Sequence, residues 1–309
     1  MTSTSPHILV IGSANVDFTV KVERLPQLGE TVSGGDFLLS YGGKGANQAL
    51  VAHLAGAPVF MIARIGWDTN GELLYQHLTA VGLNPQGLLR DPEVPAGVAL
   101  IMVDSQGHNL IAAAPGSNRR LSVADVQALE AKAFPGGILL TQLETPSETV
   151  EYGLRRALEA GMTTVLNPAP GRPLREDFLA LPHIITPNET EASLLSGITV
   201  TDLDTARQAG DRLLAMGCQT VIITLGAQGA LLARRGEVRH FPAFPVTPVD
   251  ATAAGDAFSG TLAAALFEGL VLDQAIVRAN AAGALCVTKR GAQEALPTRQ
   301  EIEALLARV

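Results

Sequence analysis

The stretch His7-Ile-Leu-Val-Ile-Gly12 is a run of large aliphatic residues that ends at a glycine. A run of this length and composition predicts a strand buried on both faces of a sheet. Similar runs recur along the chain, and segments with helical character lie between them. The predicted strands are 7–12, 59–66, 137–143, 163–167, 183–186 and 220–225, and the predicted helices are 45–55, 71–81, 122–133, 146–160, 189–195 and 202–216. This alternation predicts an α/β fold with a doubly wound, mainly parallel sheet and helices on both of its faces.

Two regions, 18–39 and 97–113, interrupt the alternation with period-two patterns and turn residues. They predict antiparallel hairpins that form a small β-sheet from inserted segments at about 16–40 and 97–114. Such a sheet suits a lid over a crevice, and the alternative is an extension that only packs or dimerises. Residues 255–288 are rich in alanine and predict two helices with a break near 269–273, packed closely against the edge of the sheet. We expect a single α/β domain over residues 1–309, with the lid inserted in it.

The composition excludes several classes of protein. Of the 309 residues 47% are apolar and 17% charged, which is too apolar for a disordered chain. The 22 Lys and Arg against 30 Asp and Glu give a net charge of −8, which disfavours nucleic acid or an anionic membrane as a partner. Cys218 and Cys286 suit neither a disulfide framework nor a zinc site. Without a signal-like start or an apolar run of roughly 18–20 residues, we expect a cytoplasmic protein.

Polar residues follow the first predicted strand, in the segment Gly12-Ser-Ala-Asn-Val-Asp17. Parallel sheets bind ligands beyond the carboxyl ends of their strands. Asn15 and Asp17 at this place suit sugar hydroxyls, which both donate and accept hydrogen bonds, although Asn and Asp also serve ordinary turns. The segment lacks G-x-G-x-x-G, which disfavours an NAD-dependent oxidoreductase.

A glycine-rich turn, Tyr41-Gly-Gly-Lys-Gly-Ala-Asn-Gln48, precedes the first predicted helix. It is not a P-loop, because Lys44 is followed by glycine rather than Ser or Thr. Its glycines allow a ligand to approach the backbone closely, and Lys44 and Asn47 add polar contacts. Glu144 follows another apolar strand, where its carboxylate lies either at the solvated rim of the sheet or in the crevice.

Asn188 and Glu191 lie three residues apart at a predicted helix start. The pair suits a hydrated Mg²⁺ beside substrate phosphates, and it equally matches a capping box; both interpretations can hold together. Farther along, the segment 224–229 forms a glycine turn able to pass close beneath a nucleotide. The six histidines show no ligand spacing, and Trp67, after a predicted strand, is expected to pack in the interior.

The most informative segment is Val249-Asp-Ala-Thr-Ala-Ala-Gly-Asp-Ala-Phe-Ser-Gly260. Small residues at a helix start leave backbone N–H groups converging at the positive end of the helix dipole, where they stabilise an anion. Asp256 in the first turn can face the same point and act as a base towards a hydroxyl. This combination is typical of phosphoryl transfer. The alternative is that Asp256 only complements the helix dipole.

Taken together, these motifs resemble those of the ribokinase family of sugar kinases. They are Gly42-Gly-Lys-Gly-Ala-Asn-Gln48, Ile65-Gly-Trp-Asp68, Pro187-Asn-Glu-Thr-Glu191, Thr224-Leu-Gly226 and Thr252-Ala-Ala-Gly-Asp-Ala-Phe258. Their order and spacing match over essentially the whole chain, to Gly291-Ala-Gln and Pro297. The resemblance implies a lid that also clasps a second subunit in a homodimer. It further implies ATP-dependent phosphorylation of the 5-hydroxyl of D-ribose, with Mg²⁺ and activation by K⁺.

By position, the resemblance also implies a role for individual residues. The sugar would be held by Asn15, Asp17, Gly43, Lys44, Asn47, Glu144 and Asp256. Asp256 would be the base, and the anion hole would be formed by Ala253, Ala254 and Gly255. ATP would contact Asn188, Thr224, Leu225, Gly226, Ala227, Gln228, Gly229, Gly255 and Asn280. K⁺ would be held by Asp250, Thr252, Cys286, Lys289 and Gly291, and Mg²⁺ would be near Glu191 through water.

The chain departs from the family pattern at a few positions. Ala251 stands where Thr is usual, and Ala295 stands where Ser is usual, which removes one expected K⁺ contact. The lid segment 112–118 also differs, so the choice of sugar is less fixed than the chemistry. The alternatives are a kinase for another sugar, such as deoxyribose, or for a nucleoside, and a non-catalytic sugar- or nucleotide-binding protein. Lys44 with Glu144 favours a free sugar, and the presence of Asp256 disfavours the non-catalytic protein.

Overall fold

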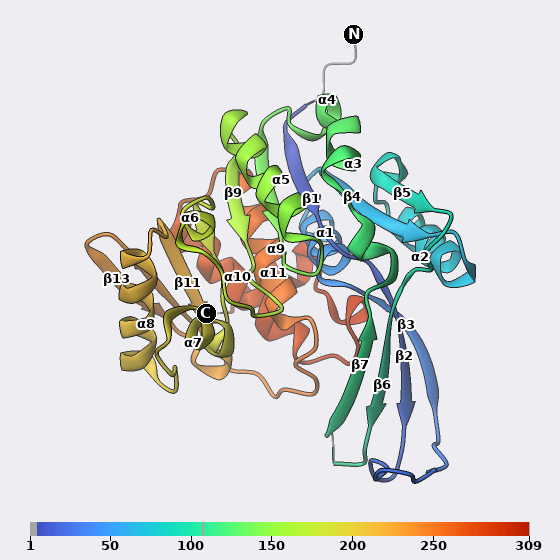
Figure 1. Ribbon diagram of the computed structural model, residues 1–309. Coiled ribbons are helices and arrows are strands. Elements are labelled where there is room, and N and C mark those ends of the chain that lie inside the picture. Colours follow the sequence, from blue (N-terminus) through green and yellow to red (C-terminus); the bar gives the residue numbers. More distant parts are fainter. Residues whose placement is uncertain (1–4, 107, 309) are drawn as a thin grey trace.

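The computed structural model describes residues 5–106 and 108–308, and their strands form two sheets (Figure 1). The large sheet has the order β13-β12-β11-β10-β9-β8-β1-β4-β5. Its strands are β1 (His7–Ile11), β4 (Val59–Gly66), β5 (Leu88–Asp91), β8 (Gly137–Thr141), β9 (Thr163–Leu166), β10 (Ile184–Ile185), β11 (Thr220–Thr224), β12 (Ala230–Arg234) and β13 (Glu237–Phe241). The pairs from β11 to β5 are parallel, whereas β12 pairs antiparallel with both of its neighbours. The α/β fold with a mainly parallel sheet is therefore confirmed.

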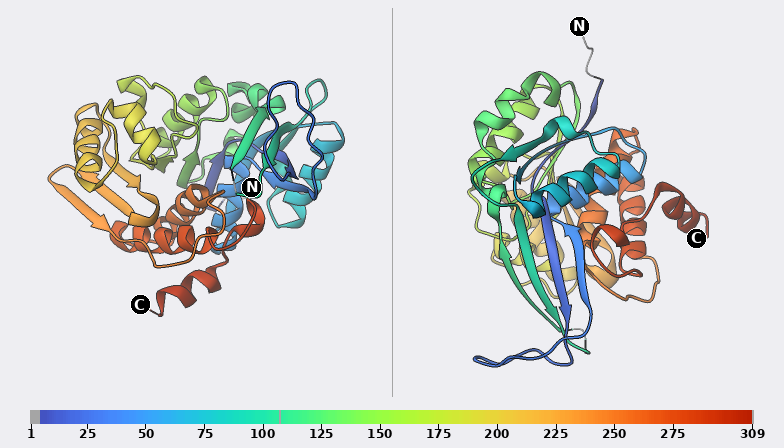
Figure 2. Two further views of the ribbon diagram at one scale, coloured as in Figure 1. Left: turned by 90° about the horizontal axis from the view of Figure 1, so that it is seen from below. Right: turned by 90° about the vertical axis from the view of Figure 1, so that its right-hand side faces the viewer.

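Helices cover both faces of this sheet (Figure 2). The longer ones are α1 (Lys44–Leu54), α2 (Thr69–Ala80), α5 (Ser147–Glu159), α7 (Glu189–Ser196), α8 (Leu203–Ala215), α9 (Ala254–Phe267), α10 (Leu272–Cys286) and α11 (Arg299–Leu306). The short ones are α3 (Val123–Ala128), α4 (Glu130–Ala133) and α6 (Glu176–Leu179), with 3₁₀ turns at η1 (Pro85–Gly87), η2 (Gly116–Arg120), η3 (Gly226–Gln228) and η4 (Gln293–Ala295). The helix expected over 122–133 is divided at Leu129, which lies outside both α3 and α4.

Alternate residues of the central strand β1 belong to two different hydrophobic cores. Ile8 and Val10 pack in the core that α1, α2, α9 and α10 share. Leu9 and Ile11 pack in the core on the other face, under α3, α5, α7 and α8. Because every side chain of Ile8–Ile11 is completely buried, the strand has the continuous apolar run of a doubly covered sheet.

The four remaining strands form the small sheet, in the order β3-β2-β6-β7. They are β2 (Asn15–Lys21), β3 (Phe37–Gly42), β6 (Gly97–Val103) and β7 (Asn109–Ala114). This sheet extends away from the body (Figures 1 and 2), and β2 begins only a short turn after β1 ends. Several large apolar side chains on it are exposed, including Phe37 at 62%, Leu100 at 56% and Ile111 at 58%.

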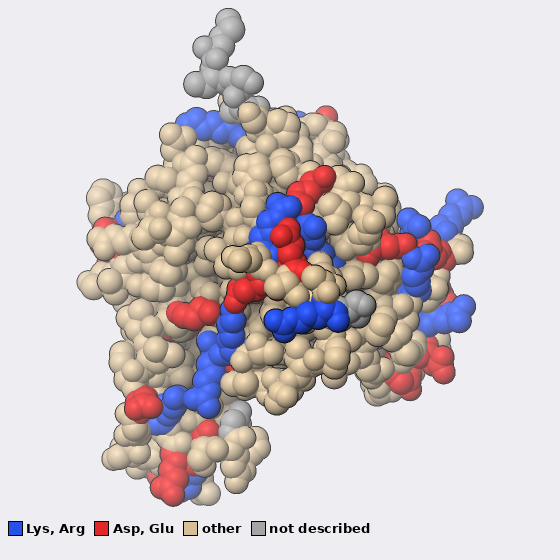
Figure 3. All heavy atoms as spheres, turned by 180° about the vertical axis from the view of Figure 1, so that it is seen from behind, with Lys and Arg blue, Asp and Glu red and all other residues tan. Residues whose placement is uncertain are grey.

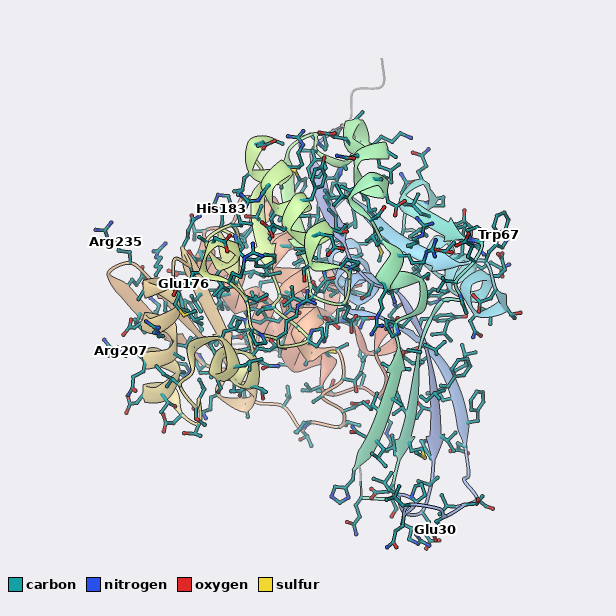
Figure 4. All side chains as sticks on the ribbon, viewed as in Figure 1. Glu30, Trp67, Glu176, His183, Arg207 and Arg235 are labelled. Carbon is teal, nitrogen blue, oxygen red and sulfur yellow. The ribbon has the colours of Figure 1, made fainter. Side chains whose placement is uncertain are left out.

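The surface shows two further features. Lys and Arg alternate with Asp and Glu on the face in Figure 3, in keeping with a moderate net charge of −8. The expectation that Trp67 packs inside is wrong, because its side chain is 70% exposed and points away from the body near Arg90 (Figure 4). Among the described residues, every helix is too short or too polar to cross a membrane.

Candidate active site

The glycine-rich start of α1 packs directly against the turn between β1 and β2. A Cβ atom on Gly43 would lie 2.7 Å from Ala14 Cα, and one on Gly45 would lie 2.5 Å from the Ser13 nitrogen. Gly43 also has a positive φ of 88°, which only glycine adopts readily. The two segments can approach so closely only because these residues lack side chains, and the start of α1 thereby lies against the backbone of Ala14 and Asn15.

Asp256 lies in the first turn of α9 with 5% of its surface exposed. Both of its carboxylate oxygens accept hydrogen bonds from α1: Asn47 Nδ2 donates to Oδ2 at 2.9 Å, and Gln48 Nε2 donates to Oδ1 at 2.8 Å. Nearby, the Asp256 carboxylate is the main reason that the pKa of Lys44 is raised, with Glu144 and Glu191 adding to it against the effect of burial. The α1 and α9 starts thus place a fixed carboxylate next to a lysine.

The backbone at the start of α9 is unusual. Ala253, the N-cap, has φ 60°, the one positive φ of a non-glycine residue in the described chain. The Ala254 N–H donates to the Ala251 carbonyl at 3.3 Å, so this group is partly occupied, contrary to the expectation that it is free. Within the described residues, the N–H groups of Ala253 and Gly255 have no backbone acceptor. They lie at the positive end of a long helix, where an anion is stabilised.

Glu144 and Asn15 line one side of a cavity of about 420 Å³. Glu144 lies in the crevice rather than at the solvated rim: its carboxylate accepts from the Ser13 hydroxyl and, at 3.0 Å, from the Lys44 N–H. Asn118 Nδ2 donates to Asn15 Oδ1 at 2.7 Å. The remaining lining residues come from the end of β7, η2 and the loops after β8 and β9: Ala113, Ala114, Pro115, Asn118, Arg119, Leu143, Thr145, Pro146, Pro170 and Arg172.

Asp17 lies close to this cavity, on β2 beside Gly42. A Cβ atom on Gly42 would lie 2.2 Å from Asp17 Oδ2, so this glycine is also required by close approach. Burial raises the pKa of Asp17 to about 6, and the carboxylates of Glu144 and Glu294 raise it further in the same direction. Asp17 therefore gains or loses its proton close to neutral pH.

The predicted nucleotide residues come together at the ends of β10 and β11. Thr224 forms a parallel bridge with Asn188, and its N–H donates to the Pro187 carbonyl at 2.9 Å. The turn that follows is η3, and a Cβ atom on Gly229 would lie 2.1 Å from the Phe241 carbonyl oxygen. Asn280 on α10 donates to the same Phe241 carbonyl at 3.1 Å. Asn188, the 224–229 turn and Asn280 are thus held by one set of main-chain contacts.

Asn188 and Glu191 form the capping box of α7. Asn188 Oδ1 accepts from the Glu191 N–H at 2.8 Å, and Glu191 Oε2 accepts from the Asn188 N–H at 3.0 Å. Burial is the main cause of a raised pKa of Glu191. In the parts of the chain that the structure describes, no three or more carboxylate, histidine or cysteine side chains gather to hold a metal. A Mg²⁺ here would therefore depend mostly on water and phosphate oxygens, which is its usual mode of binding.

The predicted K⁺ residues form a connected loop beside α9. Asp250 accepts from the Thr252 N–H at 2.9 Å, the Thr252 hydroxyl at 2.6 Å and the Gly291 N–H at 3.1 Å. The Cys286 thiol donates to the Thr252 carbonyl at 3.4 Å. Lys289 directs its ammonium to Glu301 at 2.6 Å, so only its backbone faces the loop. Ala295, where a Ser was expected, is completely buried.

The comparisons with known proteins agree with this geometry. Residues 5–299 match the model of the pfkB family of carbohydrate kinases. The chain is 41% identical to a ribokinase of Haemophilus influenzae, over 95% of this chain and 96% of that protein. The chain belongs to the pfkB family of carbohydrate kinases.

Solved structures of the pfkB family carry the same fold over nearly the full length. A ribokinase from Thermotoga maritima is 36% identical with a TM-score of 0.89, covering 98% of this chain and 100% of that one. The Arabidopsis thaliana ribokinase complexed with ribose and ATP is 31% identical with a TM-score of 0.90, covering 98% and 99%. Membership of the family makes the protein a carbohydrate kinase, which transfers a phosphoryl group to a sugar hydroxyl.

Several residues that build the site of this pfkB family member had no predicted role. Asn118 clamps the turn between β1 and β2, because its Oδ1 accepts from the Ala14 N–H at 2.9 Å and its Nδ2 donates to the Ala14 carbonyl at 3.2 Å. Gln48, the residue after Asn47, also donates a hydrogen bond to the Asp256 carboxylate. Its place in the glycine-rich motif was the available signal, but only the tertiary structure shows that two adjacent amides hold opposite oxygens of one carboxylate.

Proposed function

We propose that this carbohydrate kinase transfers the γ-phosphoryl group of ATP to the 5-hydroxyl of D-ribose, giving D-ribose 5-phosphate and ADP. The observation that carries the proposal is the Asp256 carboxylate, held by two amides beside the N–H groups that begin α9. The curated relative from Haemophilus influenzae is a ribokinase, and the Arabidopsis thaliana relative binds ribose and ATP. Among the described lining residues of the cavity none is aromatic, which favours a free sugar over a nucleoside.

In this mechanism Asp256 takes the proton from the sugar hydroxyl as the oxygen attacks the γ-phosphorus. The new P–O bond forms in line with the bond to ADP, which breaks, and Asp256 later releases its proton to solvent. The transferred group carries negative charge throughout. The N–H groups of Ala253 and Gly255 are assigned to it, because the helix dipole and fixed donors stabilise charge without reorganisation. The Ala254 N–H would join them only by leaving the Ala251 carbonyl.

The sugar would lie between the start of α1 and the small sheet. Asn15, Asp17 and Glu144 supply acceptors for its hydroxyls, Asn47 and Lys44 supply donors, and Gly43 leaves room for the ring. Support comes from the cavity itself, which Asn15 and Glu144 line together. The Asn47 Oδ1 atom is buried and has no partner among the described residues, so it offers an acceptor to an incoming hydroxyl.

ATP would lie along the 224–229 turn, with contacts from Asn188 and Asn280. The residues present fit the two expected cations. A buried single carboxylate, Glu191, suits a Mg²⁺ that keeps its waters and binds phosphate. The loop of Asp250, Thr252, Cys286, Lys289 and Gly291 offers one carboxylate and several carbonyls, which suits K⁺. Mg²⁺ neutralises phosphate charge when bound, and K⁺ would stabilise the loop that leads into α9.

The small sheet would act as the lid and as the contact between two subunits. Its exposed Phe37, Leu100 and Ile111 support this proposal, because a monomer rarely exposes several large apolar residues together. The two cysteines are free and buried, which is in keeping with the expected cytoplasmic location.

The substitution Asp256→Asn tests the proposed base. It keeps the shape of the side chain, but the new NH₂ group must face one of the two donors Asn47 and Gln48, so we expect a less stable protein that still folds and binds ribose with nearly unchanged affinity by calorimetry. Turnover of ATP and ribose should fall by about 10²–10⁴-fold, the usual effect of losing a general base. Asp273→Asn is the matched control, because Asp273 occupies the first turn of the neighbouring helix α10 and should leave turnover unchanged.

Near-normal turnover by Asp256→Asn would refute the base and favour the alternative in which Asp256 only complements the dipole. The sugar is tested separately, by ATP consumption with a panel of pentoses, hexoses and nucleosides, each in KCl and in NaCl. The fastest turnover is expected with ribose and KCl. Preference for deoxyribose or a nucleoside would correct the substrate, and no turnover of any compound would support a non-catalytic binding protein.

A further inference from the structure

Gln48 sits at the centre of a buried chain of amide groups behind Asp256. Its Nε2 donates to Asp256 Oδ1 at 2.8 Å and to Asn167 Oδ1 at 3.0 Å. Its Oε1 accepts from Gln142 Nε2 at 2.6 Å. The Gln48 side chain is completely buried, so both N–H bonds and the carbonyl of its amide are satisfied by protein alone.

The orientation of the Gln48 amide is set, through Asn167, by the Thr186 backbone carbonyl, which can only accept a hydrogen bond. Asn167 Nδ2 donates to the Thr186 backbone carbonyl at 2.9 Å, which turns Asn167 Oδ1 towards Gln48. Oδ1 requires a donor, so Gln48 must present its NH₂ group to Asn167 and therefore to Asp256. A reversed Gln48 amide would place its oxygen against two oxygens, which a buried site does not tolerate.

The members of the chain come from different parts of the fold. Gln142 follows β8, Asn167 follows β9, Thr186 follows β10, and Gln48 lies on α1. The carboxyl edge of the sheet thus fixes an α1 side chain, and this side chain in turn holds a carboxylate on α9. The hydrogen bond from Gln48 is one link between the Asp256 carboxylate and the sheet edge, beside the direct contact of Thr186 Oγ1 with Ser259 Oγ on α9 at 3.0 Å.

We propose that Gln48, oriented by Gln142 and Asn167, is a positioning residue that aims the Asp256 carboxylate at the sugar hydroxyl. Gln48 fixes Oδ1 and Asn47 fixes Oδ2, so the plane of the carboxylate is determined from both sides. The inference rests on the proposed role of Asp256 as the base. Gln48 acts through Asp256 and touches neither substrate.

The test is a double-mutant cycle of Gln48→Met and Asp256→Asn. Met preserves the length of the side chain but cannot donate, so kcat should fall by about 10- to 100-fold, as expected for a hydrogen bond to a charged group. The Kd for ribose, measured by calorimetry, should change by less than about twofold. In the Asp256→Asn background, Gln48→Met should produce no further fall, because the group through which it acts is already absent.

A second variant and a control keep the test decisive if Gln48→Met does not fold. Gln142→Met leaves both the donor to Asp256 and the Asn167 contact in place and removes only the hydrogen bond to Gln48 Oε1, so kcat should fall less and again show no effect beside Asp256→Asn. Thr261→Val, a buried α9 position whose hydroxyl has no partner in the described chain, should leave kcat unchanged.

The two proposals fail in different ways. If Asp256→Asn alone keeps normal turnover, the proposed base is wrong. If Asp256→Asn abolishes turnover while Gln48→Met and Gln142→Met keep normal kcat, the positioning role is wrong. Falls in kcat that multiply in the double mutants, or that come with an equal loss of ribose affinity, would also overturn it, since both indicate a merely structural contribution.

Discussion

At the scale of single residues, Asp17 is the carboxylate whose charge changes near neutral pH. Burial is the largest cause of its raised pKa of about 6, and Glu144 and Glu294 contribute in the same direction. Glu294 lies on η4, far along the chain, so a distant loop influences a residue of the proposed sugar site. A sugar that donates hydroxyls to Asp17 would favour its ionised form.

This pKa predicts how stability depends on pH. Because the folded pKa lies above the unfolded value of about 3.9, the folded state binds the proton more tightly, and this stabilisation is lost as pH rises through about 6. The change that Asp17→Asn causes in the free energy of unfolding should therefore be more stabilising at pH 7.5 than at pH 4, by roughly 2 kcal/mol. Urea unfolding at the two pH values measures this difference.

Asp36→Asn provides the control for Asp17, because Asp36 is an exposed aspartate near the same small sheet. Its substitution should change stability little at either pH. An effect of Asp17→Asn that is equal at pH 4 and pH 7.5 would contradict the raised pKa.

The site residues that could be predicted from sequence are those whose role is indicated by the residues next to them in the chain. Asp256 was predicted from the small residues before it, and Glu144 from its place after an apolar strand. The role of Gln48 was not predicted, because it depends on Asn167 and Gln142, which come from two other strand ends. Asn118 was missed for the same reason: its partners lie on a turn about a hundred residues earlier.

At the scale of elements, the contact between α1 and α9 determines the site, because these helices carry Gln48 and Asp256. Gly260 makes this contact possible: a Cβ atom there would lie 2.3 Å from Val51 Cγ1 and 2.5 Å from the Gln48 carbonyl oxygen. The alanine-rich texture of 255–288 predicted close packing. It did not identify α1 as the partner, because the same small residues suit any neighbouring helix.

Two glycine-to-alanine substitutions should have opposite effects on stability. Gly260→Ala should destabilise by about 1–3 kcal/mol, since the new methyl group forces α1 and α9 apart. Gly283→Ala on α10 should stabilise by about 0.5–1 kcal/mol, since its nearest neighbour, the Ala254 carbonyl oxygen, lies at an ordinary 3.6 Å and alanine favours the helix. Thermal and urea unfolding of both variants measures the effects, and equal effects would contradict this packing.

The elements that sequence analysis predicted are those with a strong local pattern. The doubly buried strands and most of the helices were found within a few residues of their observed bounds, whereas α11, which has a capping box of Thr298 and Glu301, was not predicted. The antiparallel pair β12 and β13 was not predicted: each strand has only five residues, and the partly exposed β13 resembles a loop until its pairing is known. The break at Leu129 was also missed, because its apolar spacing continues across the bend.

At the scale of the whole molecule, the exposed apolar side chains of the small sheet predict a homodimer. Ile111→Asp and Leu100→Asp should each convert the dimer to a monomer, because a charge buried without a partner in an interface is costly. Light scattering after size-exclusion chromatography measures the mass. Val271→Asp, at an exposed apolar position on the body, should leave the mass unchanged.

A wild-type protein that is monomeric at micromolar concentration would contradict the proposed interface. The three-layer body, with helices on both faces of the sheet, could be predicted from sequence because alternation of strand and helix has few solutions. The period-two pattern of the small sheet does not predict whether two chains associate, since strands of a lid and strands of a subunit interface both show it.

The join between the two sheets has a mechanical consequence. β1 is an interior strand of the large sheet, between β8 and β4, and the chain passes from it through the turn that Asn118 clamps straight into β2. The small sheet is therefore joined to the body by a short turn of backbone that is itself held by hydrogen bonds. We expect bending of the small sheet to grow with distance from this turn, so that Asn15 and Asp17 are displaced less than the distal loop at Glu30 (Figure 4).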